Sequence, residues 1–120
     1  SVGGTYTVKS AYDPNEVEPY KVDLSKEFDL AVGKSYQTTF TMDGWGDSHD
    51  AFKSKITNVS GTYKYIINGD NGYSYTSDEC TSAETFTTTN AKSGVKYTVT
   101  IVNTGATKLT GKLNITSYIN

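Results

Sequence analysis

Residues 95–101 alternate between apolar and polar side chains. Val95, Tyr97, Val99 and Ile101 share one parity, and lysine and threonine occupy the other. Successive side chains of a β-strand point to opposite faces, so a period of two predicts a strand with one buried face and one wet face. This pattern constrains the fold more than any other feature of the chain.

A second alternating run, residues 109–115, follows a turn cluster at residues 103–106. One-sided burial is typical of antiparallel sheets, whereas strands of parallel sheets are buried on both faces. We therefore expect the two runs to pair with each other as an antiparallel hairpin.

Shorter runs repeat the pattern along the chain. Glycine and asparagine in residues 68–72 predict a tight hairpin, because these residues adopt the positive φ angles that such turns need. The threonine-rich run at residues 85–89 predicts an edge strand. Besides the two runs above, strands are expected at residues 6–8, 20–24, 36–42, 52–59, 63–67, 73–75 and 85–89.

These elements predict an all-β fold, an antiparallel β-sandwich of jelly-roll-like form with eight or nine short strands. A chain of 120 residues has room for one core, so we expect a single domain over residues 1–120. The expected core comprises Tyr6, Val8, Val22, Leu24, Phe40, Phe52, Ile56, Tyr65, Ile67, Tyr97, Val99, Ile101, Leu113 and Ile115.

The charged residues argue against nucleic acid and other polyanions as partners. Every basic residue is lysine, none is arginine, and the net charge is −2, which disfavours nucleic acid and polyanions in general.

No apolar stretch approaches the length of a transmembrane helix, so we expect no membrane insertion. The abundance of Thr, Ser, Asn and Tyr and the near absence of cysteine favour a secreted or cell-surface location.

The chain offers little for catalysis. His49 is the single histidine and Cys80 the single cysteine, and Cys80 is flanked by carboxylates that disfavour its thiolate. We expect a protein that is not an enzyme.

Three carboxylates stand close together in the glycine-rich segment 43–50. Asp43, Asp47 and Asp50 supply the hard oxygen ligands that Ca²⁺ prefers, although the spacing is not that of an EF-hand. The segment is therefore either a Ca²⁺ site or a solvated turn.

Aromatic residues are the candidates for ligand binding. Trp45, the single tryptophan, stands between glycines in the same segment, where it either stacks on a ligand or closes one end of the sandwich. Tyr73 and Tyr75 lie on the strand predicted to return from the hairpin. With Tyr63 and Tyr65 they form either an outward binding face or part of the core, and the parity shared with Ile67 favours the core.

Residues 50–56 (DAFKSKI), residues 94–105 (GVKYTVTIVNTG) and the run at 109–115 resemble the pre-peptidase C-terminal type of sandwich domain, which follows the catalytic domains of secreted bacterial proteases and collagenases. The resemblance implies a domain that binds matrix or polymer, often together with Ca²⁺.

Two functions follow as hypotheses. The first is a non-catalytic extracellular binding module for a polymer or matrix ligand, either polysaccharide or collagen-like, that works through Trp45 and exposed tyrosines. The second is a structural subunit of a bacterial surface layer or fibre. Self-association would then proceed by strand addition, with residues 1–10 as the donor and the edge at residues 85–89 as a partner.

Overall fold

The structure is a computed structural model that describes residues 23–42, 51–89, 91 and 94–118. The described residues contain no helix, and so none that is long and apolar enough to cross a membrane. The strands are β1 (Asp23–Leu30), β2 (Ser35–Thr41), β3 (Ala51–Ser60), β4 (Tyr63–Gly69), β5 (Ser74–Thr76), β6 (Glu84–Thr88), β7 (Lys96–Asn103) and β8 (Leu109–Tyr118).

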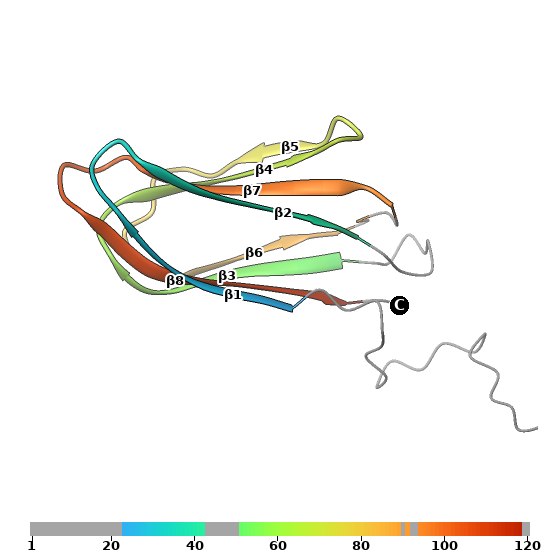
Figure 1. Cartoon of the computed structure of the whole chain (residues 1–120), viewed down its shortest axis with the longest axis horizontal. Helices are drawn as coiled ribbons and strands as arrows, with labels where there is room; N and C mark the ends of the chain where they lie inside the picture. The colour runs from blue at the N-terminus through green and yellow to red at the C-terminus, as the bar shows by residue number, and fades with distance from the viewer. Residues whose placement is uncertain (1–22, 43–50, 90, 92–93, 119–120) are drawn as a thin grey trace, which may run out of the picture.

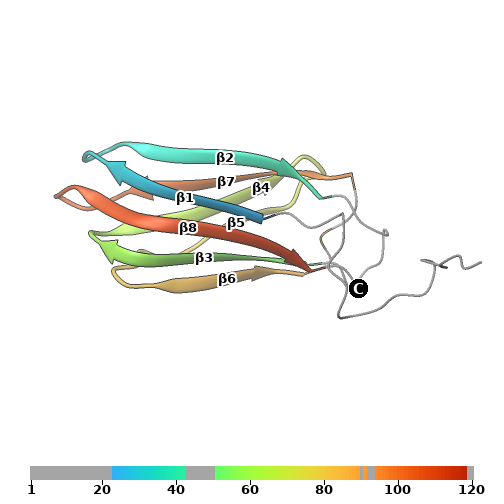
Figure 2. The ribbon, with the colours of Figure 1, turned by 60° about the horizontal axis from the view of Figure 1, so that its bottom comes forward.

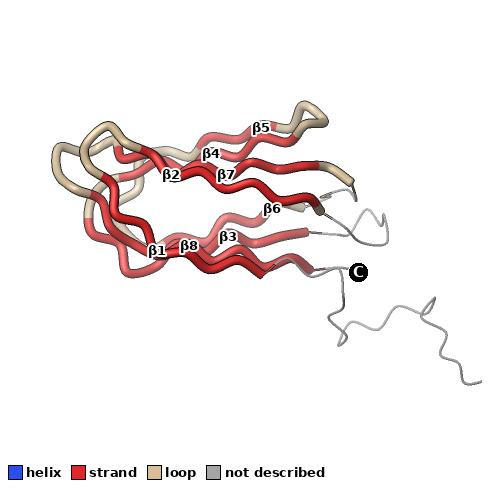
Figure 3. The backbone as a smooth tube through the Cα atoms, in the orientation of Figure 1, coloured by secondary structure: helices blue, strands red, loops and turns tan. Residues whose placement is uncertain are grey.

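The strands form two antiparallel sheets that pack face to face (Figure 1). The first sheet has the order β1-β8-β3-β6 and the second has the order β2-β7-β4-β5. Among the described strands, β4 and β5 are the one consecutive pair that shares a sheet, and every other connection crosses the sandwich (Figure 3). Eight strands in two such sheets make a jelly roll, which confirms the predicted fold class.

One predicted hairpin is confirmed and the other is wrong. β4 pairs with β5 as the glycine-rich turn indicated. β7 and β8, however, belong to different sheets and do not pair, as Figure 2 shows. The Asn103 side chain folds the connection across the sandwich, because its amide nitrogen donates to the carbonyl oxygens of Leu30 (3.0 Å) and Thr107 (2.9 Å).

The core lies between the inner faces of the two sheets. Ten of the predicted core residues are buried, namely Phe40, Phe52, Ile56, Tyr65, Ile67, Tyr97, Val99, Ile101, Leu113 and Ile115. Leu24 packs against this core but is only partly buried. Tyr6, Val8 and Val22 lie outside the described residues. The prediction did not include Phe28, Met42, Tyr63, Ala91 and Leu109, which are also buried.

Tyr65 joins the two sheets through the middle of this core. It lies on β4 in the second sheet, and its hydroxyl is 2.7 Å from the hydroxyl of Ser54 on β3 in the first sheet. Both residues have no exposed surface. Burial raises the pKa of the Tyr65 phenol well above its ordinary value, and the bond to Ser54 lowers it in part.

We predict that each hydroxyl needs the other. Ser54→Ala or Tyr65→Phe leaves one buried hydroxyl without its partner, which is expected to lower the free energy of unfolding by about 1–3 kcal/mol. The double variant removes both groups and is expected to lose less than the sum of the two single changes. Urea unfolding of the four proteins measures this coupling, and additive losses would contradict it.

Candidate functional site

An open groove of about 380 Å³ lies between β5 and β6, the edge strands of the two sheets. No charged residue lines it, and all but one of its lining side chains carry a hydroxyl group. The lining residues are Tyr65, Tyr73, Tyr75, Thr85, Phe86, Thr87 and Thr88.

The turn before β5 places Tyr73. The amide of Gly69 donates to the carbonyl oxygen of Tyr73 (2.8 Å), and the amide of Tyr73 donates to the side-chain oxygen of Asn71 (3.2 Å). Gly72 has a φ of 97°, which a residue with a Cβ rarely adopts. Asp70 ties the same turn to β7, because its amide donates to the carbonyl oxygen of Lys96 (2.9 Å).

Tyr75 is held from the other end of β5. Next to the strand, Ser77 donates its backbone amide to the carbonyl oxygen of Tyr65 (2.8 Å). The Ser77 hydroxyl in turn accepts the amide of Tyr65 (2.9 Å) and donates to the carbonyl oxygen of Asp78 (2.8 Å). Although β5 has only three residues, it is fixed at both ends.

The parity argument for Tyr75 is correct, but the side chain is not core. Tyr75 pairs with Ile67 and therefore faces the inner side of the sheet. It is nevertheless 44% exposed, because β5 is an edge strand with no described strand beyond it. Tyr73 is 39% exposed, while Tyr63 and Tyr65 are fully buried.

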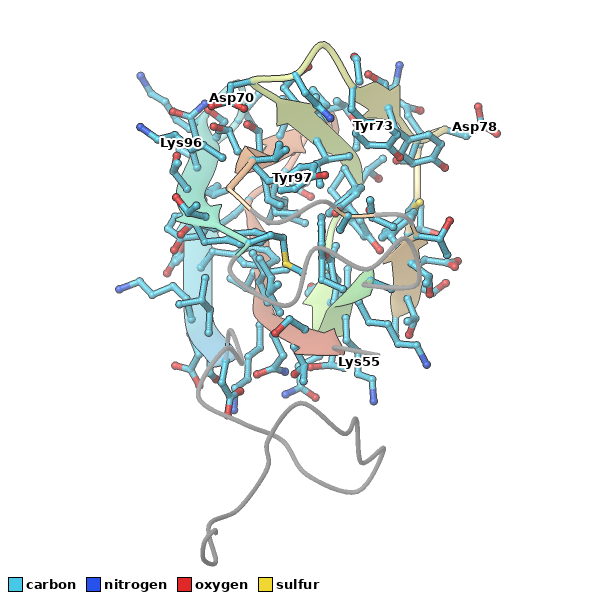
Figure 4. All side chains as sticks on the ribbon, turned by 90° about the vertical axis from the view of Figure 1, so that its right-hand side faces the viewer. Lys55, Asp70, Tyr73, Asp78, Lys96 and Tyr97 are labelled. Atoms are coloured by element: carbon cyan, nitrogen blue, oxygen red, sulfur yellow. The ribbon has the colours of Figure 1, made fainter. Side chains whose placement is uncertain are left out.

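The exposed tyrosines extend the aromatic core to the surface. The ring centroid of Tyr73 lies 6.3 Å from that of Tyr97, and Tyr75 lies 6.4 Å from Tyr65 and 6.3 Å from Phe86. In the end-on view of Figure 4, Tyr73 and Tyr97 both lie in the upper part of the sandwich, on the side of the second sheet. The exposed rings thus lie beside rings that are buried or half-buried.

Phe86 forms the opposite wall. Its ring stacks on Tyr65 with a centroid distance of 4.2 Å and an interplanar angle of 2°. The threonine-rich run at residues 85–89 predicts an edge strand, which is confirmed for β6, but it does not predict a site residue there. The available signal was an aromatic residue between threonines on an edge strand.

This arrangement has the chemistry of a binding surface. Its volume falls in the range of small-ligand sites, about 300–1,000 Å³. Aromatic faces present apolar area, and the tyrosine and threonine hydroxyls both donate and accept hydrogen bonds. The lining holds no carboxylate, imidazole, thiol or amine.

The other predicted site residues lie outside the described part of the chain. These are Trp45 and the proposed Ca²⁺ ligands Asp43, Asp47 and Asp50. β2 ends and β3 begins at the end of the sandwich that also holds the β4–β5 turn (Figure 1). Within the described residues, no three His, Cys, Asp or Glu side chains are grouped so that they could hold a metal ion.

The chain matches no protein-family model, and a search of curated proteins found no match either. The resemblance to the pre-peptidase C-terminal type of domain therefore stays a prediction.

The Ca²⁺ site has a direct test. If Asp43, Asp47 and Asp50 bind the ion, folding is stabilised by about 2.7 kcal/mol at 100-fold excess over Kd, on the order of 10 °C in Tm. Thermal melts in EDTA and in millimolar Ca²⁺ measure this shift, and Asp47→Ala is expected to abolish it. A shift below about one degree would show that the segment is a solvated turn.

Proposed function

We propose that this chain is a non-catalytic extracellular module that binds a polymer, with polysaccharide as its ligand. The observation that carries the proposal is the uncharged groove between β5 and β6, in which Tyr73 and Tyr75 expose rings held in place by buried neighbours. Secretion or attachment to the cell surface is part of the same proposal, since such polymers lie outside the cell.

The lining favours polysaccharide over a collagen-like peptide. A sugar ring has an apolar face of C–H groups and a rim of hydroxyls, which complement an aromatic face bordered by hydroxyl groups. Tyr75 and Phe86 supply the aromatic faces, and the phenols of Tyr73 and Tyr75 supply hydroxyl groups. Thr85 and Thr87 line the rim, since they pair with Lys55 and Lys53 and point to the outer face of β6. The groove is also open to solvent, as a site for one stretch of a long chain must be.

Removing one ring tests the proposal. Tyr75→Ala is expected to weaken binding to soluble polysaccharides about tenfold, equivalent to about 1.4 kcal/mol, because truncation of a central aromatic contact typically costs more than 1 kcal/mol. Tyr75→Phe keeps the ring and is expected to retain most of the affinity. Isothermal titration calorimetry against a panel of neutral glucans, galactans and a collagen peptide measures the effect.

Two controls accompany this series. Ser74→Ala changes a neighbouring residue of β5 that is not among the groove's lining residues, and it is expected to bind like the wild type. The emission of Trp45, the single tryptophan, reports separately whether this residue contacts the same ligand. Equal affinity of the wild type and Tyr75→Ala would overturn the role of the groove, whatever Trp45 does.

The second hypothesis, assembly by strand addition, has less support. Lys26 on β1 pairs with Leu113, and Glu84 on β6 pairs with Ile56, so each charged residue points to the inner side of an edge strand. Inward-pointing charges on edge strands oppose pairing with another chain. The edge strand β5 has only three residues, which leaves few backbone groups for a ladder.

Size-exclusion chromatography separates the two hypotheses. A binding module is expected to elute as a monomer at all concentrations, with or without residues 1–10. Concentration-dependent assembly that disappears on deletion of residues 1–10 would favour the structural subunit instead.

A further inference from the structure

A second groove, of about 430 Å³, lies on the outer face of the first sheet. It is entirely polar and draws on all four strands of that sheet. Its lining residues are Asp23, Lys53, Lys55, Thr85, Asn114 and Thr116. We call it the lysine groove.

The strand register gathers hydrogen-bond donors around Lys55. Lys55 pairs with Asn114 on β8 and with Thr85 on β6, so the three side chains form one row across the sheet. Side chains directly opposite each other on neighbouring strands have Cβ atoms about 5 Å apart. An ammonium, an amide and a hydroxyl therefore stand close enough to donate to one anionic group.

The acidic residues of this face are concentrated on β1, at the far edge of the sheet. Asp23 pairs with Thr116, which pairs with Lys53, so two strands separate Asp23 from β6. Lys55 is exposed and forms no ion pair with any residue in the described part of the chain. Glu84 lies on β6 but points to the inner side.

The two grooves meet at β6. Thr85 lines both of them, and no described strand covers the outer edge of β6. In the end-on view of Figure 4, Tyr73 lies on one layer and Lys55 projects outward from the other. We call the groove between β5 and β6 the aromatic groove. A chain that stacks in it can therefore continue over β6 into the lysine groove.

We propose, on the premise that the aromatic groove binds polysaccharide, that the ligand is an acidic polysaccharide whose carboxylates bind at Lys55 and Asn114. Composition argued against polyanions because the chain lacks arginine and has a net charge of −2. That charge is spread over the molecule and screened beyond about 8 Å at physiological ionic strength, whereas Lys55 acts at contact distance on one face. An acidic polysaccharide of this kind carries at most one carboxylate per sugar, so its charge density is lower than that of a nucleic acid.

The test compares ligands that differ only in charge. Polygalacturonate and hyaluronan are each titrated beside their methyl esters, in which the same backbone is neutral. The wild type is expected to bind each acid about three- to fivefold more tightly than its ester at low salt, and added NaCl is expected to remove this preference.

Three variants show which residues cause the preference for the acid over the ester. Lys55→Gln is expected to abolish it, while Lys34→Gln, an equal charge change at an exposed position before β2, is expected to keep it. Tyr75→Ala is expected to weaken acid and ester alike. Equal affinity of the wild type for acid and ester, or an equal loss in the two lysine variants, would overturn the proposal. If Tyr75→Ala still weakens the binding of both polymers in that case, the proposed function stands although the role of Lys55 does not. Failure of every polymer to bind would overturn both.

Discussion

The hydrogen bond between Tyr65 and Ser54 is the interaction on which both the core and the aromatic groove depend. It joins β4 to β3, and so one sheet to the other, at a point with no access to solvent. The backbone amide of Tyr65 donates to the Ser77 hydroxyl beside β5. The ring of Tyr65 stacks on that of Phe86. A single buried phenol therefore links the two sheets and contacts residues on both sides of the groove.

The groove is open because of how the jelly roll ends on this side. β5 is shorter than the strands it accompanies, and β6 has a partner only in β3 among the described strands. A side chain that points inward from such an edge strand contacts the core on one side and solvent on the other. Tyr75 illustrates this: the alternation predicts its direction correctly, but the position of its strand in the sheet decides its exposure.

Alternation was enough to predict the fold class and most of the core, since a period of two reports which residues point inward. It carries no information on which sheet a strand joins, so residues 95–101 and 109–115 were paired wrongly. One of the two Asn103 contacts that separate them is with Leu30, which is distant in sequence. Phe28 was missed because Lys26 interrupts the apolar parity of β1. Tyr73 and Tyr75 were predicted as site residues. Phe86 was not, because an aromatic residue between threonines on an edge strand does not show which face its ring takes until β6 is paired with β3.

The distribution of charge on the edges is consistent with a surface kept for a ligand. β1 and β6 each carry one inward-pointing charge, Lys26 and Glu84, and these oppose the addition of a further strand. No charged residue lines the aromatic groove, so no charge repulsion keeps other molecules away from its exposed rings. Exposed aromatic rings gathered in one groove are a liability in solution unless a partner covers them. Under the proposed function, a hydrated polymer would cover these rings better than a protein strand, because sugar hydroxyls can pair with the hydroxyl groups of the lining without needing a free backbone ladder.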